Sequence, residues 1–149
     1  MAELLFYHLE RSNLDQVLPQ LLEKTLERGW KAVVRAGSDE RVKSLDGHLW
    51  TYRDDAFMPH GVAGEGHDPL QPVLLTTGTE NPADANVLFA VDGADIAGAE
   101  TYQRCVLMFD GNDPGAVSAA RVHWKAVKEA GHEATYWQQN QQGKWEKKA

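Results

Sequence analysis

The fold of this chain is decided by the segment LLFYHLERSNLDQVLPQLLEKTLERGWKAVVRAGSDERVKSLDGHL, residues 4–49. Two short apolar runs, LLFYHL at 4–9 and KAVVRA at 31–36, have the length and composition of buried strands. Each run is followed by a pattern typical of a helix. Strand, helix, strand and helix at this spacing imply parallel strands joined by right-handed crossovers, so we expect an α/β sheet.

Apolar spacing defines both helices of this segment. In the first helix the apolar side chains lie three or four residues apart, and Gly29 ends the helix. Pro19 costs little if Asp15 is the cap, because its missing N–H then falls in the first turn; otherwise it kinks the helix. Gly37 and Ser38 cap the second helix. The apolar positions are Leu14, Val17, Leu18, Leu21, Leu22 and Leu26 in the first helix, and Val42, Leu45 and Leu49 in the second.

The remaining strands and the last helix extend the same sheet. The predicted strands are residues 73–77, 86–91, 104–110 and, from weaker alternation, 132–137. Asp113 is expected to cap the last helix, with Pro114 at its first position and Gly131 at its end. The core stripe of this helix is Val117, Ala120, Trp124 and Val127.

We therefore expect a single Rossmann-like α/β domain over residues 1–137, with a mostly parallel sheet and helices on both faces. A charged fraction of 25% and a hydrophobic fraction of 42% are ordinary for a globular protein and argue against disorder in this part. Residues 138–149 are polar and repetitive, so we expect a frayed tail in which Trp145 is the only candidate anchor.

Charge and cysteine content restrict the function. The net charge of −7 disfavours a protein that neutralises phosphates over a wide surface, so we expect contact with DNA to be indirect, through other proteins. The single cysteine, Cys105, allows no internal disulfide and no cysteine metal cage, and its apolar surroundings predict a buried structural thiol. Without a leader-like start or a long apolar run, we expect a cytoplasmic protein without membrane contact.

The segment LWTYRDDAFMPHGVAGEG, residues 49–66, fits neither the helix before it nor the strand after it. A plain connector would be short and polar, whereas this one holds large apolar side chains. Its Leu-Trp pair, acidic spacer and Phe-x-Pro-His-x-x-Ala-Gly-Glu-Gly pattern resemble the central signature of the chi subunit family of bacterial DNA polymerase III. The residues that carry the resemblance are Trp50, Phe57, Pro59, His60, Ala63, Gly64, Glu65 and Gly66, with Phe6 and Tyr7 at the start of the chain.

Trp50 and Phe57 are the first candidate binding residues. From composition alone, both rings would pack on their own domain, as most large aromatic side chains do. The resemblance implies instead that this pair receives the psi subunit of the polymerase, with a helicase as an alternative partner at the same surface. A ring held in a loop stiffened by proline loses little entropy on binding, which suits an interface hot spot.

The last helix carries the second candidate site. Arg121, Lys125 and Lys128 lie on one row beside Trp124, which on its own predicts a solvated basic face. The resemblance implies that this row binds the acidic, phenylalanine-ended C-terminal tail of single-stranded DNA-binding protein. Arginine can fork onto a carboxylate, lysine adds charge, and an aromatic wall receives the terminal ring. Val117 departs from the family, which tends to carry a further basic residue there.

Three other patterns are candidates for chemical sites. The glycines of residues 61–66 lack the helix and the Lys-Ser/Thr pair of a phosphate loop, so we reject a nucleotide site there. The group His60, Glu65, His67 and Asp68 lacks a convincing fourth metal ligand, and we expect His60 to fix the loop by hydrogen bonding. Asp92 and Asp110 end apolar strands, where α/β enzymes place catalytic carboxylates, although Asp-Gly is also a common turn.

The resemblance implies a non-catalytic accessory subunit of DNA polymerase III in DNA replication. It would link single-stranded DNA-binding protein to the psi subunit and the clamp loader, with no catalytic residue, cofactor or metal of its own. Two alternatives stay open: a small α/β nucleotide-binding enzyme that uses Asp92 or Asp110, and a chi-like adaptor for a helicase.

Overall fold

The computed structural model describes residues 3–9, 14–51, 59–63, 71–79, 81, 84–91, 93–94, 96–139, 142 and 144–148. The strands are β1 (Glu3–Leu9), β2 (Ala32–Arg35), β3 (Gly61–Val62), β4 (Val73–Thr76), β5 (Val87–Val91), β6 (Arg104–Asp110), β7 (Glu133–Gln139) and β8 (Trp145–Lys147). The helices are α1 (Leu14–Glu27), α2 (Asp39–Thr51), α3 (Pro114–Glu129) and the short 3-10 helix η2 (Ala99–Thr101). No helix of this described part has the length and apolar character needed to cross a membrane.

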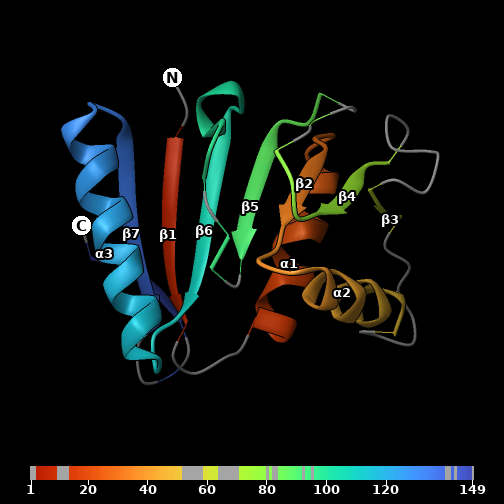
Figure 1. Cartoon of the computed structure of the whole chain (residues 1–149), viewed down its shortest axis with the longest axis horizontal. Coiled ribbons are helices and arrows are strands. Elements are labelled where there is room, and N and C mark those ends of the chain that lie inside the picture. Colours follow the sequence, from red (N-terminus) through yellow and green to blue (C-terminus); the bar gives the residue numbers. More distant parts are fainter. Residues whose placement is uncertain are drawn as a thin grey trace.

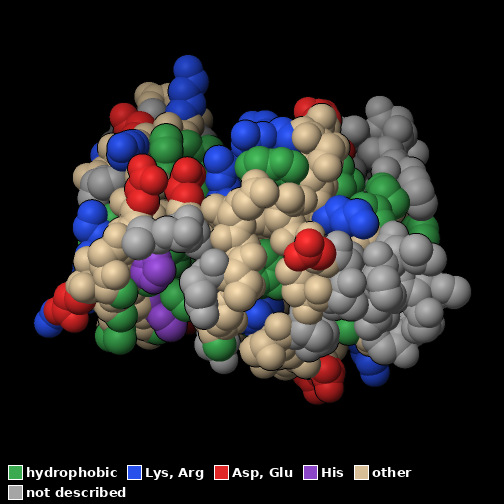
Figure 2. Space-filling view, turned by 90° about the horizontal axis from the view of Figure 1, so that it is seen from above, with side chains coloured by type: hydrophobic (Ala, Val, Ile, Leu, Met, Phe, Trp, Pro, Cys, Tyr) green, Lys and Arg blue, Asp and Glu red, His purple; other side chains and the backbone are tan. Residues whose placement is uncertain are grey.

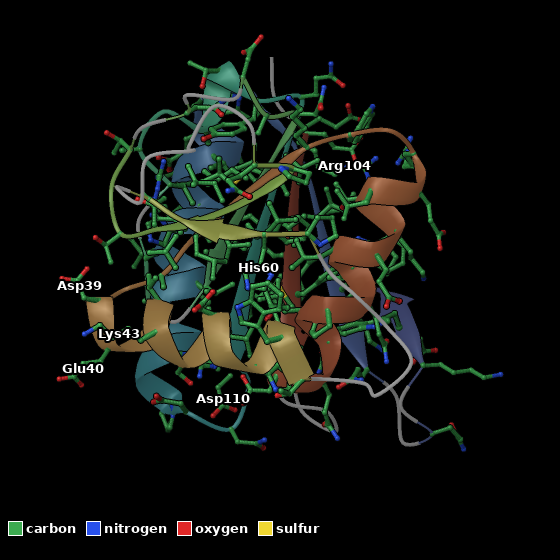
Figure 3. All side chains as sticks on the ribbon, turned by 90° about the vertical axis from the view of Figure 1, so that its right-hand side faces the viewer. Asp39, Glu40, Lys43, His60, Arg104 and Asp110 are labelled. Atoms are coloured by element: carbon green, nitrogen blue, oxygen red, sulfur yellow. The ribbon has the colours of Figure 1, made fainter. Side chains whose placement is uncertain are left out.

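The strands form one sheet in the order β3-β4-β2-β5-β6-β1-β7-β8. Every neighbouring pair is parallel except β7 and β8, which are antiparallel. Figures 1 and 3 show α3 on one side of the sheet, with α1 on the other. The expected single α/β domain with a mostly parallel sheet is thus confirmed, and β3 is a short edge strand that the sequence pattern did not reveal.

Two hydrophobic clusters lie on the two faces of the sheet. Alternate residues of each strand enter opposite clusters, as the pleat requires. In β1, for example, Leu5 and Leu9 face α1 and α2, whereas Leu4 and Phe6 face α3. The strands β2, β4 and β5 are buried throughout, which explains their continuous apolar runs in the sequence. Helices α1 and α2 pack on one face of the sheet, and on the other face Ala94, Ala99 and Tyr102, from the connection before β6, join the cluster.

Two helix caps form as the sequence predicts. The Ser38 hydroxyl accepts a hydrogen bond from the backbone N–H of Arg41 at 3.2 Å, at the start of α2. Asp113 accepts from the backbone N–H groups of Gly115 at 2.9 Å and Ala116 at 3.4 Å, at the start of α3. These bonds satisfy donors that the first helical turn leaves without an intrahelical partner.

Pro19 lies beyond the first turn, because α1 begins at Leu14 rather than after an Asp15 cap. The proline cannot donate to the carbonyl of Asp15, its partner in an unbroken helix. His48 of α2 supplies the missing donor, with its Nε2 atom 2.5 Å from that carbonyl oxygen. The Asp15 carboxylate in turn pairs with Arg41 at 3.2 Å, so the irregular turn of α1 is held by α2.

The C-terminal segment differs from the expected frayed tail. Strand β7 continues to Gln139, and residues 145–147 return antiparallel to it as β8. Trp145 stacks on Tyr7, with ring centres 4.8 Å apart and planes 27° apart. Trp145 is therefore the anchor that the sequence suggested, and it fixes β8 because the packed ring offsets the entropy of ordering a polar segment.

Candidate partner-binding surfaces

Trp50 lies at the end of α2 and is 53% exposed. The helix turns its apolar positions Val42, Leu45 and Leu49 toward the sheet, so the neighbouring position 50 points outward. This exposed ring makes Trp50 the candidate contact residue of the surface. The expectation from composition, that this ring packs on its own domain, is therefore wrong for its exposed part, and its role in binding a partner stays a prediction.

His60 holds the base of the Trp50 ring. Its ring centre lies 4.8 Å from that of Trp50, and its Nε2 atom donates to Asp46 Oδ1 at 2.9 Å. Asp46 and Trp50 are one helical turn apart on α2, and the His60 side chain between them is fully buried. The predicted role of His60 in fixing the loop by hydrogen bonding is confirmed, and Asp46 is a residue of this surface that the sequence reading missed.

Several residues of the motif lie outside the described residues. They are Phe57, Gly64, Glu65, Gly66, His67 and Asp68. The structure therefore describes one of the two aromatic residues expected at this surface. Among the residues that it describes, no group of three or more His, Cys, Asp or Glu side chains could hold a metal ion.

Trp124 forms the aromatic wall of the second surface, on α3. Its ring meets Phe6 edge-on at 5.3 Å and Tyr136 edge-on at 5.7 Å, between the ring centres. The ring is half-buried, because α3 presses it against β1 and β7. Tyr136 was not singled out from the sequence; its weakly alternating segment gave no sign that α3 would lie over it.

The cationic row lies along the outside of α3. Arg121, Lys125 and Lys128 are exposed, and none of them forms an ion pair with a described residue. The Lys128 Nζ atom lies 5.4 Å from the centre of the Trp124 ring, within the range of a cation–π contact. Val117 is half-buried and packs against the cluster beneath α3. The row and its aromatic neighbour therefore form one surface, as their spacing predicted.

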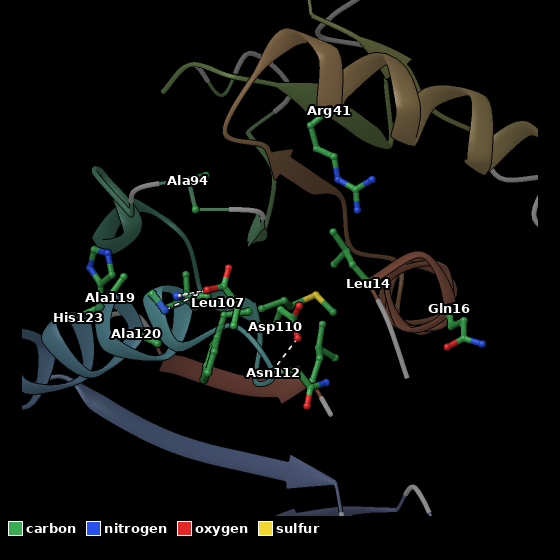
Figure 4. Close-up of a pocket in the computed structure, with 17 residues that line it drawn as sticks. Leu14, Gln16, Arg41, Ala94, Leu107, Asp110, Asn112, Ala119, Ala120 and His123 are labelled. Carbon is green, nitrogen blue, oxygen red and sulfur yellow. Dashed lines mark hydrogen bonds between the residues drawn. The ribbon is translucent and has the colours of Figure 1, made fainter. Parts of the chain in front are cut away.

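A cavity of about 730 Å³ lies at the carboxyl ends of β1 and β6, between the starts of α1 and α3 (Figure 4). Asp110 lines it, and its Oδ1 atom accepts from the backbone N–H of Asn112 at 2.9 Å. Asp113 also lines it and caps α3, so the first N–H groups of this helix are already bonded. The start of α3 therefore offers a phosphate no open backbone donor, although Arg41 and His123 also line the cavity. Asp92, the other carboxylate of the enzyme alternative, lies outside the described residues.

Comparison with known proteins decides the family. The model of the family described as "DNA polymerase III chi subunit, HolC" matches residues 1–135. The chain belongs to the DNA polymerase III chi subunit family.

Two curated relatives agree with this assignment to the chi family. The chain is 29% identical over 97 residues to the "Probable DNA polymerase III subunit chi" of Rickettsia prowazekii, which covers 65% of this chain and 59% of that protein. It is 29% identical over 117 residues to the "DNA polymerase III subunit chi" of Pseudomonas aeruginosa, which covers 78% of this chain and 80% of that protein. The chi-family chain thus spans less than two thirds of the rickettsial relative. Both relatives are named as subunits of a polymerase, in line with an expected role without catalysis of its own.

Proposed function

We propose that this chi-family chain is a non-catalytic accessory subunit of DNA polymerase III that acts in the cytoplasm during DNA replication. In this role it binds the acidic tail of single-stranded DNA-binding protein at α3 and the psi subunit of the clamp loader at the Trp50 surface. The observation that carries the proposal is the cationic row of α3, whose exposed side chains have no ion-pair partner among the described residues. On a chain with a net charge of −7, such a row is a local site for an acidic ligand.

The α3 surface fits the chemistry of an acidic peptide that ends in phenylalanine. Arg121 can donate two parallel hydrogen bonds to a carboxylate, and Lys125, one turn further, adds a second charge. The Trp124 ring offers an apolar wall, and its packing on Phe6 and Tyr136 fixes its orientation before binding. A wall that is already ordered reduces the entropy lost on association.

The Trp50 surface supports the second contact. The ring is exposed and is held by His60 and Asp46, so it can enter a partner pocket with little loss of freedom. The psi subunit is our proposed partner, and a helicase is the alternative occupant. Copurification from a native lysate, with wild type and Trp50→Ala in parallel, distinguishes the two by the protein that is lost.

The α3 contact is tested with a fluorescent peptide that ends in Asp-Ile-Pro-Phe. We expect Arg121→Ala to weaken peptide binding by about tenfold or more, since a charged hydrogen-bonded pair contributes about 1.5–3 kcal/mol. Lys43→Ala, on the exposed start of α2, is the matched control and leaves binding unchanged (Figure 3). Asp110→Ala also leaves it unchanged. Binding that survives Arg121→Ala, or nucleotide binding that is lost with Asp110→Ala, contradicts the proposal and favours the enzyme alternative.

A further inference from the structure

A strip of cations and aromatic rings crosses the sheet face opposite α3. We call it the cation–aromatic strip. Its members come from the turn between α1 and β2 and from β1, β6, β7 and β8, and they are Arg28, Trp30, Arg104, Tyr7, Trp137, Trp145 and Lys147. All four rings pack at the edge of the cluster that the sheet shares with α1 and α2.

The first half of the strip surrounds Trp30. The guanidinium carbon of Arg28 lies 4.2 Å from the centre of this ring, and that of Arg104 lies 5.5 Å from it. Arg104 also pairs with Glu3, Nε to Oε1, at 3.4 Å. Figure 2 looks onto the amino ends of the parallel strands, and it shows Lys and Arg side chains beside hydrophobic ones near the middle of this side. Arg28 is exposed and has no ion pair with a described residue.

The second half of the strip is built on Tyr7. This ring stacks on Trp145 at 4.8 Å and meets Trp137 edge-on at 6.5 Å, between ring centres. Tyr7 and Arg104 stand on the same face of the sheet, because Glu3, the register partner of Arg104, lies four residues before Tyr7 on β1. Burial raises the pKa of Tyr7, and the positive charge of Arg104 opposes that rise. Lys147 is the register partner of Trp137, so both side chains stand on one face of the sheet. Lys147 is exposed and lies at the far end of the strip.

We propose that the cation–aromatic strip binds a short length of single-stranded DNA. Partly exposed rings on a sheet face are stacking platforms for unpaired bases, and exposed cations at the two ends of the strip can meet phosphates. An acidic peptide would match the cations but offers at most an occasional aromatic side chain, whereas single-stranded DNA presents a planar base at every unit, and a duplex keeps its bases stacked inside. The contact is local, so it is compatible with a net charge of −7, which disfavours only a wide phosphate-binding surface.

The strip and the cationic row of α3 lie on opposite faces of the sheet. A tail peptide on α3 and a strand on the strip can therefore be held at the same time. This inference goes beyond the proposed function and does not depend on it, because no residue of the strip belongs to either protein-binding surface. If the peptide does not bind α3, the inference about the strip still stands. If the oligonucleotide does not bind the strip, the proposed function still stands.

The test measures fluorescence anisotropy of a labelled oligothymidylate of about 15 nucleotides with the full chain. We expect quenching of tryptophan fluorescence on binding, and an affinity that falls about 100-fold between about 20 mM and 200 mM salt, as about three phosphate contacts require. Arg28→Glu and Lys147→Glu should each weaken binding about tenfold at the lower salt concentration. Lys43→Glu makes the same charge change away from the strip and should alter binding by less than about twofold.

The stacking contribution is tested separately. Trp145→Ala should weaken binding and reduce the quenching to the part that comes from Trp30 and Trp137, whereas Trp145→Phe keeps a ring and should retain most of the affinity. Circular dichroism and the urea midpoint of each variant show whether the fold is kept. Absence of oligonucleotide binding at the lower salt concentration overturns the inference, as does binding that is lost in Arg121→Ala but kept in Arg28→Glu. Equal binding of polyglutamate also overturns it, because the strip would then be a general anion site.

Discussion

His60 shows how one residue can organise a surface made by another. It comes from the loop after α2, yet it lies between Asp46 and Trp50 of that helix. Its ring is fully buried, so its hydrogen bond to Asp46 is protected from water on the histidine side. The exposed tryptophan thus stands on a rigid base, which suits the partner contact proposed for it.

The His60 contact gives a prediction for stability. Asp46→Ala leaves a buried imidazole nitrogen without its partner, so we expect the free energy of unfolding to fall by about 1–3 kcal/mol. Urea denaturation monitored by circular dichroism measures the change. Glu40→Ala, an exposed position at the start of the same helix, is the control and should change stability by less than about 0.5 kcal/mol. Equal effects of the two substitutions would show that the bond does not stabilise the fold.

Cys105 gives a prediction for reactivity. Burial raises the pKa of its thiol to about 12, so the native protein keeps the unreactive protonated form. We expect alkylation by iodoacetamide at about pH 8.5 to be at least about 100-fold slower in the native protein than in urea, by mass spectrometry. The raised pKa also means that stability falls as the pH rises above the ordinary thiol value of 9.0, because only the unfolded chain then loses the proton. Rapid native alkylation would contradict the buried position.

At the scale of the elements, α3 depends on its cap. Asp113 bonds the backbone N–H groups of Gly115 and Ala116, which have no partner within the helix. Asp113→Ala should lower the free energy of unfolding by about 1 kcal/mol, whereas Asp113→Asn, which keeps an acceptor, should cost a few tenths of that. Urea midpoints of the two variants provide the comparison. A larger loss with asparagine than with alanine would mean that the carboxylate acts otherwise than as a cap.

The junction of α1 and α2 gives a second prediction at this scale. His48 donates to the carbonyl of Asp15, which Pro19 leaves without its helical partner. His48→Ala should therefore cost about 1–3 kcal/mol in the free energy of unfolding. Pro19→Ala restores a helical donor, so the loss caused by His48→Ala should be smaller in that background. A double-mutant cycle measured in urea tests this coupling, and strict additivity of the two changes would refute it.

At the scale of the whole molecule, the two proposed protein-binding surfaces lie on different faces of the sheet. Trp50 belongs to α2, which packs on one face, and the cationic row belongs to α3, which packs on the other. Their separation allows two partners to be held together without contact between them. Tethering of this kind raises the effective concentration of one partner near the other.

Separated surfaces predict independent binding. Trp50→Ala should change the affinity for the Asp-Ile-Pro-Phe peptide by less than about twofold, because distant sites without shared partners contribute additively. Isothermal titration calorimetry of the peptide with the wild type and with Trp50→Ala gives the two dissociation constants to be compared. A change of about tenfold would instead require a rearrangement that couples the two helices through the sheet.

The sequence by itself determined the elements of this protein and its family. Apolar runs, helical spacing and the caps Ser38 and Asp113 act within a few residues, so they can be read locally. The family signature is likewise a local pattern, and the comparison with known proteins confirmed it. These features indicated the α/β class, the three α-helices and every described strand except β3 and β8.

Only the tertiary structure decided the strand order and the contacts between distant segments. Three contacts join residues far apart in the chain. They are the hydrogen bond from His48 to the carbonyl of Asp15, the stacking of Trp145 on Tyr7, and the edge-on packing of Trp124 and Tyr136. Such contacts depend on which strands become neighbours and in what register. A side-chain pattern of period two or 3.6 fixes which face of an element is buried, but not which element covers it.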